Sequence, residues 1–188
     1  MAYNIQDLRG VKPEEGTSYF FDTNIWLYRL YLPMDQLQPW EKEYLRFFDE
    51  IVSISGDDSP RIVVNNLLVS ELINACISRE YSQYKNFIGK EISKKEFRSL
   101  EEYEDLLADI VDEIESYSEF IDILYDTQLN PIDDILTKLP TQLDYCDYYY
   151  YELALEHNLV IVTNDGDFLV PGVDILTTHR GLLYRNGD

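Results

Sequence analysis

Short apolar runs that alternate with helical patterns restrict the fold of this chain more than any other feature. The runs TSYFF at 17–21, RIVV at 61–64 and LVIVT at 159–163 are rich in β-branched or aromatic residues, and a helix or turn signal follows each of them. Strands of a parallel sheet are buried on both faces, so they appear as continuous apolar runs joined by crossover helices. The sequence therefore predicts an α/β fold with helices on both faces of a mostly parallel sheet.

Apolar residues recur at helical spacing in four further segments, which are 39–51, 67–77, 99–114 and 144–157. Ser99 and Glu102 form a capping-box pattern that predicts the start of the third helix. Asn158 is the expected C-cap of the fourth. FIDIL at 120–124 fits either a strand or a continuation of the preceding helix, and VDIL at 173–176 predicts an edge strand.

The length and composition suit one domain. A chain of 188 residues that is 45% hydrophobic can bury one sizeable core. Residues 1–16 contain Pro13 and Gly16 and show no apolar period, which predicts a loosely held lead-in. We expect residues 17–188 to form a single domain.

The balance of charge restricts the partners. The formal net charge is -21 and the sequence pI is about 4.2, which argues against a broad nucleic-acid-binding surface, because phosphate contacts need clustered Lys and Arg. A nucleic-acid substrate would need a local feature, such as a bound metal or a basic partner, to overcome this field. The acid-rich segment EEYEDLLADIVDEIES at 101–116 is most simply a solvated helix face.

Neither a membrane span nor a thiol framework is indicated. The sequence has no run of eighteen apolar residues and a polar start, so we expect a cytoplasmic protein. Cys76 and Cys146 are its only cysteines, without a CxxC pair and with only two histidines, which excludes the usual disulfide and zinc patterns. Both cysteines are predicted to lie on helices as small core residues.

Acidic residues follow the predicted strands. Asp22 ends the first strand, Glu71 lies in the helix after the second, and Asp165 follows the third. Sites in open α/β sheets form outside the carboxyl ends of the strands, so these side chains are expected to share that edge. Asp147 lies near the start of a helix that runs back towards the last strand. A group of carboxylates suits Mg²⁺ or Mn²⁺ and needs a cation to offset its own repulsion.

Three segments resemble the PIN-domain nucleases. SYFFDTNIWLYRL is similar to the opening strand and D-T-N of that family, LLVSELINA to its Ser-Glu-Leu step, and DYYYYELALEHNLVIVTNDGDF to its third segment. The resemblance covers most of the chain and implies a three-layer α/β/α fold with a mostly parallel central sheet. The helical region at about 79–140 is longer than in compact members, and four tyrosines replace the usual Ala-rich helix.

The resemblance also implies the site. The four metal-binding acids of the family fall on Asp22, Glu71, Asp147 and Asp165, and its supporting polar positions fall on Thr23, Asn24 and Thr163. It implies a Mg²⁺- or Mn²⁺-dependent endoribonuclease that acts on RNA. Many members are toxins of toxin-antitoxin pairs, which would match this acidic chain with a basic antitoxin, and homodimerisation is common among them.

Other readings exist for each acid. Asp22 fits a helix N-cap, and Glu71 could pair with Arg61 or Arg79. Asp144 is a second candidate for the third ligand and is kept as a supporting acid. Asp167 fits ordinary turn chemistry better than ligation.

The tyrosines at 148–151 span one helical turn. Core packing is the simplest account of Tyr149 and Tyr150. An exposed pair among the four could instead stack on a base or contact a protein.

Two alternative functions remain at this stage. The first is a PIN-like binding or scaffolding module without cleavage, which the acidic surface favours and the intact acid set disfavours. The second is a phosphotransfer enzyme with Asp22 as nucleophile. It is disfavoured because such sites read D-x-D, and Asn24 occupies the second acidic position.

Overall fold

All strands of the central sheet are parallel. The computed structural model describes residues 3–32, 34–125 and 137–185. Within them a six-stranded sheet has the order β1-β6-β5-β2-β3-β4. The strands are β1 (Asn4–Asp7), β2 (Ser18–Phe21), β3 (Arg61–Asn65), β4 (Ile121–Leu124), β5 (Val160–Val162) and β6 (Asp174–Thr177). Each of the five pairings is parallel, as the sequence predicts.

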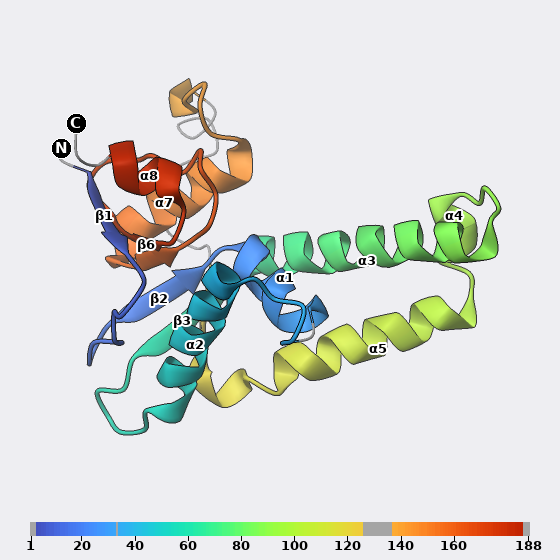
Figure 1. Ribbon diagram of the computed structural model, residues 1–188, viewed down its shortest axis with the longest axis horizontal. Coiled ribbons are helices and arrows are strands. Elements are labelled where there is room, and N and C mark those ends of the chain that lie inside the picture. The colour runs from blue at the N-terminus through green and yellow to red at the C-terminus, as the bar shows by residue number, and fades with distance from the viewer. Residues whose placement is uncertain (1–2, 33, 126–136, 186–188) are drawn as a thin grey trace.

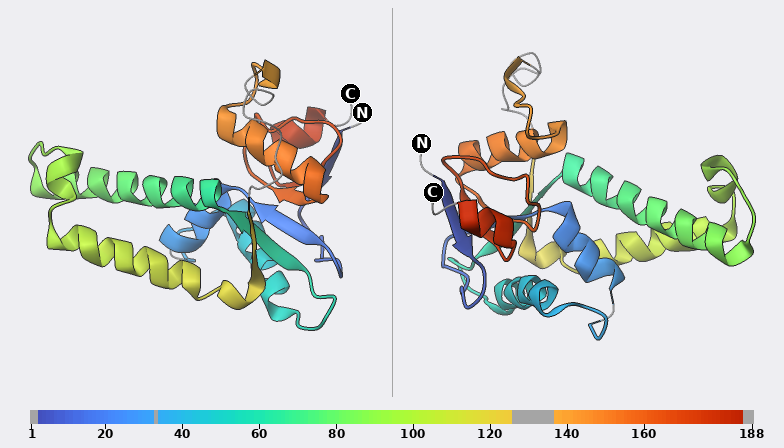
Figure 2. Two further views of the ribbon diagram at one scale, coloured as in Figure 1. Left: turned by 180° about the vertical axis from the view of Figure 1, so that it is seen from behind. Right: turned by 45° about the horizontal axis from the view of Figure 1, so that its top comes forward.

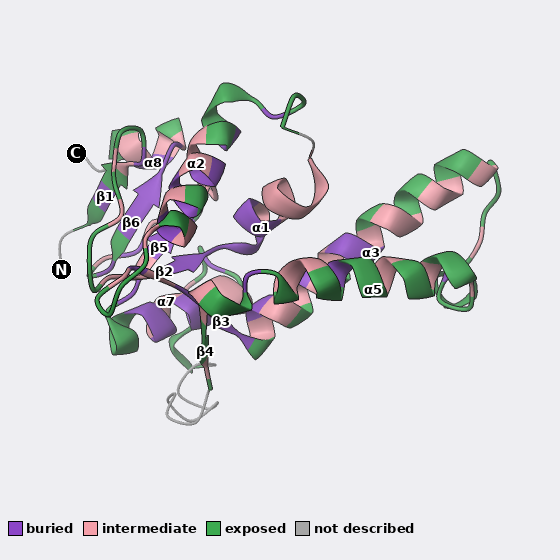
Figure 3. Cartoon of the chain, turned by 90° about the horizontal axis from the view of Figure 1, so that it is seen from below, coloured by how far each residue is buried: buried purple, intermediate pink, exposed green. Residues whose placement is uncertain are grey.

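Helices cover both faces of this sheet (Figures 1 and 3). They are α1 (Thr23–Tyr31), α2 (Pro39–Ser53), α3 (Asn66–Ile88), α4 (Lys94–Phe97), α5 (Glu101–Glu115), α7 (Tyr145–His157) and α8 (Arg180–Arg185), with a 3-10 turn at Ser118–Phe120. Successive side chains of β2 point to opposite faces of the sheet and contact the two helical layers. Tyr19 and Phe21 contact Phe47 of α2 on one face, whereas Phe20 contacts Tyr150 of α7 on the other. The predicted α/β/α architecture is confirmed.

The N-terminal segment differs from expectation. Residues 4–7 form β1, which pairs in register with β6 from Asn4 opposite Asp174 to Asp7 opposite Thr177. This part of the predicted lead-in is therefore a strand at the edge of the sheet. As a result β6 lies between β1 and β5, and the prediction of an edge strand at 173–176 is wrong. Ile5 is the one buried residue of β1, so no apolar period marks the strand.

The middle of the chain forms a helical arm. In both views of Figure 2, α3 and α5 run side by side away from the sheet, with α4 at the far end. The capping box lies at Ser93 and Glu96 and begins α4. Leu100 is the N-cap of α5 and makes no side-chain cap, so the box predicted at Ser99 and Glu102 is wrong. The arm returns to β4, which resolves the ambiguity at 120–124 in favour of a strand.

The tyrosine run is packed into the core. Tyr148, Tyr149 and Tyr150 are buried and Tyr151 is half-buried, so core packing of Tyr149 and Tyr150 is confirmed and the alternative of an exposed pair is not. Asn158 ends α7 in the left-handed conformation, with φ of 53°, as predicted for its C-cap. Cys76 is buried and Cys146 half-buried, and both thiols are free. No helix in the described residues has the length and apolar character needed to cross a membrane.

Candidate active site

The sheet register places Asp22 at the centre of the carboxyl edge. Phe21 pairs with Val162, and Phe20 with Val63, so the next residue, Asp22, is flanked by Thr163 and Asn65. The Asp22 amide extends the ladder by donating to the Val162 carbonyl at 3.0 Å. Although Asp22 occupies the N-cap position of α1, its side chain makes no capping hydrogen bond. The carboxylate is thus directed to other partners.

Those partners are the side chains that follow two neighbouring strands. Thr163 Oγ1 and Asn24 Nδ2 each donate to Asp22 Oδ2 at 2.6 Å. Thr163 Oγ1 also accepts the Asp165 amide at 2.9 Å, and Asp165 Oδ1 accepts the Asp167 amide at 2.8 Å. One hydroxyl therefore connects the acid after β2 to the acid after β5, and the backbone of Asp167 shapes the turn.

Glu71 joins the same edge from α3. Its Oε2 accepts hydrogen bonds from Thr23 Oγ1 at 3.0 Å and from the Tyr150 hydroxyl at 2.7 Å. The alternative arginine partners are engaged elsewhere. Arg61 pairs with Asp122, and the Arg79 guanidinium lies 5.1 Å from the ring centroid of Tyr31. Thr23 thus connects the helix that follows Asp22 to Glu71.

Asp147 lies in the first turn of α7. Asp144 is the N-cap of the helix, and its Oδ1 accepts the Asp147 amide at 2.9 Å. Asp144 therefore acts as the cap of α7.

The electrostatics show that the four acids are coupled. Burial raises the pKa of Asp22 to about 6; the Thr163 hydrogen bond opposes this rise, and Asp165 and Glu71 add to it. Burial also raises the pKa of Asp147 to about 8, reinforced by Asp144, Asp22, Asp165 and Glu71 in that order. The pKa of Asp147 therefore responds to all three other predicted ligands and that of Asp22 to Asp165 and Glu71, which places the four acids within Coulombic range at one edge of the sheet.

Two tyrosines take part that the sequence did not single out for the site. Tyr150 holds Glu71, as described above. Tyr44 is fully buried on α2, where its hydroxyl donates to the Thr163 carbonyl at 3.0 Å and accepts the Thr178 amide at 2.8 Å. It thereby fixes the backbone from which Thr163 reaches Asp22. Both residues follow the ordinary apolar period of a helix, so nothing in the sequence distinguishes them from core residues.

The donor chemistry fits a hard divalent cation. The side-chain hydrogen bonds to Asp22 end on Oδ2 and those to Glu71 end on Oε2, so each carboxylate is anchored through one oxygen. Across the described ranges, no three His, Cys, Asp or Glu side chains form a ready-made cage for a metal ion. Mg²⁺ does not need such a cage, because it usually keeps several waters and takes one or two carboxylates directly.

Comparison with known families places the chain. A family model described as "PIN domain" matches residues 19–172. The chain belongs to the PIN domain family. PIN domains are generally nucleases that use divalent metals, and the resemblance carried by the three sequence segments is thereby confirmed. The matched residues run from β2 to the turn before β6, so they include all four predicted acids.

Two solved structures share features of this PIN domain. One is the crystal structure of VapBC2 from Rickettsia felis bound to a DNA fragment from their promoter, with a TM-score of 0.47 and 12% identity over 85% of this chain and 97% of that chain. The other is PAE2754 from Pyrobaculum aerophilum, with a TM-score of 0.44 and 18% identity over 92% of this chain and 96% of that chain. No curated protein matches the sequence.

Proposed function

We propose that this PIN domain is a Mg²⁺- or Mn²⁺-dependent endoribonuclease. The observation that carries the proposal is the coupling of Asp22, Glu71, Asp147 and Asp165 at the carboxyl edge, together with the Thr163 hydroxyl that joins two of them. These four acids would hold the cation. When bound, such a cation lowers the pKa of water and offsets charge on phosphate oxygens.

The side chains around the cation would have different roles. Asp22 and Glu71 are each anchored through one oxygen, which leaves Oδ1 of Asp22 and Oε1 of Glu71 to bind. Thr163, Asn24, Thr23 and Tyr150 orient these two carboxylates. We assign to Asp147 the orientation of the attacking water, because within the described residues no side-chain hydrogen bond holds its carboxylate, in contrast to those of Asp22 and Glu71.

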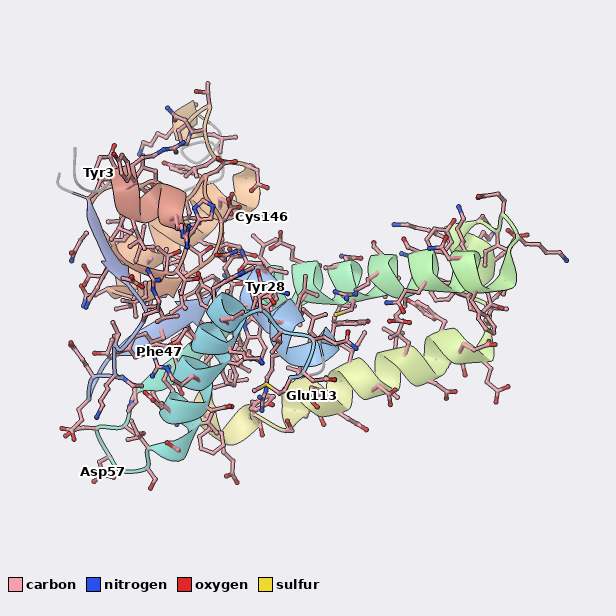
Figure 4. All side chains as sticks on the ribbon, in the orientation of Figure 1. Tyr3, Tyr28, Phe47, Asp57, Glu113 and Cys146 are labelled. Atoms are coloured by element: carbon pink, nitrogen blue, oxygen red, sulfur yellow. The ribbon has the colours of Figure 1, made fainter. Side chains whose placement is uncertain are left out.

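Cleavage of a mixed single-stranded RNA pool tests the proposal. Wild type should cut in Mg²⁺ or Mn²⁺ and stop in EDTA, and Asp22→Asn and Asp147→Asn should be inactive. Asp57→Asn is the matched control. Like the two active-site variants, it removes one negative charge, but it does so in an exposed loop. Figure 4 shows Asp57 far from Tyr28 and from Cys146, the residue directly before Asp147, so this variant should cut like wild type. Intact RNA with wild type across several metals would favour the non-catalytic scaffold instead. Equal cutting by Asp147→Asn would place the activity elsewhere.

We also propose a basic protein partner of the antitoxin type. A groove of about 550 Å³ between α1, α3 and α5 combines an apolar lining from Leu30, Leu106 and Ile110 with acids that include Glu102, Asp105 and Asp109. The segment EEYEDLLADIVDEIE of α5 contains no Lys or Arg, and none of the ion pairs in the described parts of the chain involves it. This combination suits an amphipathic helix with a basic face.

Co-expression with the product of an adjacent reading frame tests the partner. A complex should co-elute with wild type and be lost when Asp105 and Asp109 are both replaced by Lys. Reversal of Asp57 and Asp58, which are equally acidic and exposed, should leave the complex intact. Loss in both double variants, or in neither, would reject this groove as the docking surface.

A further inference from the structure

A second recess adjoins the acid edge and has the opposite charge. It encloses about 420 Å³, and its lining includes Arg9, Trp40, Asn164, Thr178, His179 and Arg180. Asn164 is the residue directly before Asp165, and Thr178 to Arg180 follow β6 directly. This basic recess therefore opens at the carboxyl ends of the strands, next to the turn that carries one of the proposed metal ligands.

The charge of the recess is exceptional for this chain. The whole sequence has 15 Lys and Arg against 36 Asp and Glu, yet two arginines and a histidine line the recess, and no acid among the described residues does. Arg9 is held in place by Asp7, with Nε 2.8 Å from Oδ1. Arg180 is exposed and takes part in none of the ion pairs found in the described residues. Its guanidinium is thus available to an anion, and phosphate is the anion that arginine recognises best.

A buried hydroxyl in the wall of the recess lacks a partner. Thr178 is only 7% exposed, and in the described residues its Oγ1 has no partner at hydrogen-bond geometry, although it lies close enough to the Tyr44 hydroxyl to lower the pKa of Tyr44. The Thr178 amide donates to the Tyr44 hydroxyl, which fixes the backbone at this position. A buried hydroxyl without a hydrogen bond is unfavourable, and a phosphate or ribose oxygen that entered the recess would provide a partner.

His179 ties the recess to the acid site. A methyl group added at Gly166 would approach His179 Cε1 to 2.6 Å, and one at Gly181 would approach it to 2.9 Å. The imidazole is therefore packed between two glycines, one of which lies in the Asp165 turn. The Leu182 amide donates to Nδ1 at 3.4 Å. His179 therefore packs against the turn that carries Asp165.

An aromatic ring completes the lining. Trp40, at the start of α2, is 38% exposed and packs edge-on against Tyr28 at 5.8 Å between centroids. A partly exposed indole beside a cationic patch is the arrangement on which proteins stack single-stranded bases.

We propose that this recess binds the nucleotide adjacent to the scissile phosphate of single-stranded RNA. Arg180 contacts its phosphate, Thr178 donates to a phosphate or ribose oxygen, and Trp40 stacks on the base. The proposal rests on the ribonuclease function proposed above. Because the negative net charge of the chain repels RNA, binding requires a local site for a polyanion, and the recess would provide one. Few phosphate contacts are involved, so the affinity for RNA should be modest and should depend only weakly on salt.

Affinity measured without cleavage tests this site. Fluorescence anisotropy of a labelled single-stranded RNA dodecamer is followed in Mg²⁺ with Asp147→Asn as the parent, so that the readout does not require turnover. Arg180→Ala should weaken binding about tenfold and reduce the slope of log Kd against log salt by about one. Arg98→Ala, an exposed arginine at the end of the arm, is the matched control and should match the parent.

A second pair of variants tests the base contact. Trp40→Ala should weaken binding about fivefold or more, as expected for loss of one stacked base, while Phe87→Ala, which removes a ring that is 89% exposed on the arm, should not. Equal affinities for Arg180→Ala and Arg98→Ala would overturn the phosphate contact, and equal affinities for Trp40→Ala and Phe87→Ala would overturn the base contact. If these losses occur but wild type cuts no RNA, the recess stands and the proposed hydrolysis falls.

Discussion

The hydroxyl of Tyr150, on α7, donates a 2.7 Å hydrogen bond to Oε2 of Glu71, on α3. Burial and the Glu71 carboxylate both raise the pKa of Tyr150, so the phenol stays protonated and remains a donor. The bond links two helices whose bonded residues are 79 positions apart in the sequence, and it positions a predicted ligand that lies within a helix rather than at the end of a strand.

Replacing Tyr150 with Phe should therefore weaken the site without emptying the core. A hydrogen bond to a charged group contributes about 1.5–3 kcal/mol, so urea unfolding should show a loss of roughly that size, and Mn²⁺ affinity should fall. Tyr151→Phe is the matched control, because the Tyr151 hydroxyl donates to the Pro171 carbonyl and not to an acid. Equal Mn²⁺ affinities for the two variants would show that Tyr150 does not position Glu71.

Thr163 should be more sensitive, because one hydroxyl serves two acids. In Thr163→Val the bond to Asp22 and the acceptor for the Asp165 amide are both lost. The Thr163 bond lowers the pKa of Asp22, so its loss should raise that pKa further and make the cation compete with a proton.

Isothermal titration should accordingly show weaker Mn²⁺ binding by Thr163→Val. Thr177→Val is the appropriate comparison, since it also removes a buried hydroxyl, one that contacts Tyr44 and the His179 amide rather than an acid. Both variants should lose stability of about 1–3 kcal/mol, and only Thr163→Val should lose metal affinity. A similar loss of affinity in both would point to a general loosening of the edge.

The parts of the fold that the sequence could predict are those with a strong apolar signal. β2, β3 and β5 are buried runs, and the helix periods are clear, so the layered architecture follows from local pattern. β1 could not be found this way, because a four-residue strand at the sheet edge buries only Ile5. That omission also made β6 look like the edge, since strand order depends on pairing between the two ends of the chain.

The candidate site could likewise be predicted only in part from the sequence. Asp22, Glu71 and Asp165 could be placed because parallel strands bring their carboxyl ends together. Tyr150 and Tyr44 could not, because their hydroxyls act only through contacts between elements far apart in sequence. The basic recess was missed for a similar reason: Arg9, Trp40 and Arg180 come from three separate segments, and none of them forms a cluster in the sequence.

Divalent metal should stabilise the folded chain. A ligand that binds only the native state at about 100 times its Kd adds about 2.7 kcal/mol, and each 1 kcal/mol raises the Tm of a protein of this size by roughly 2–4 °C. Thermal unfolding with millimolar Mn²⁺ should therefore shift upward in wild type and in Asp57→Asn, and much less in Asp22→Asn. An unchanged Tm in wild type would count against a cation site at these acids.

Stability in EDTA should fall as pH rises, and Asp22 should cause part of the fall. Burial raises the pKa of Asp22 from 3.8 to about 6, and burial raises the pKa of Asp147 from 3.8 to about 8. Between pH 3.8 and each of these raised pKa values, the folded chain binds more protons than the unfolded chain. The unfolding free energy therefore falls as pH rises through this range. The stability associated with the two protonated acids is fully present below about pH 4, and it is lost as pH rises to about 6 for Asp22 and to about 8 for Asp147.

For the buried Asp22 this rise of about two pKa units corresponds to roughly 3 kcal/mol at most. Urea unfolding in EDTA from pH 4 to pH 8 should show a steep decline for wild type and Asp57→Asn, and a shallower one for Asp22→Asn, in which that proton cannot be released. Both wild type and Asp57→Asn share the repulsion of the acidic surface, so the difference from Asp22→Asn isolates the site. Mn²⁺ should flatten the wild-type decline, because a cation stabilises the ionised carboxylates. Parallel declines for wild type and Asp22→Asn would mean that Asp22 ionises in the folded chain as easily as in the unfolded one, and the coupling of the four acids would then be too weak to define a metal site.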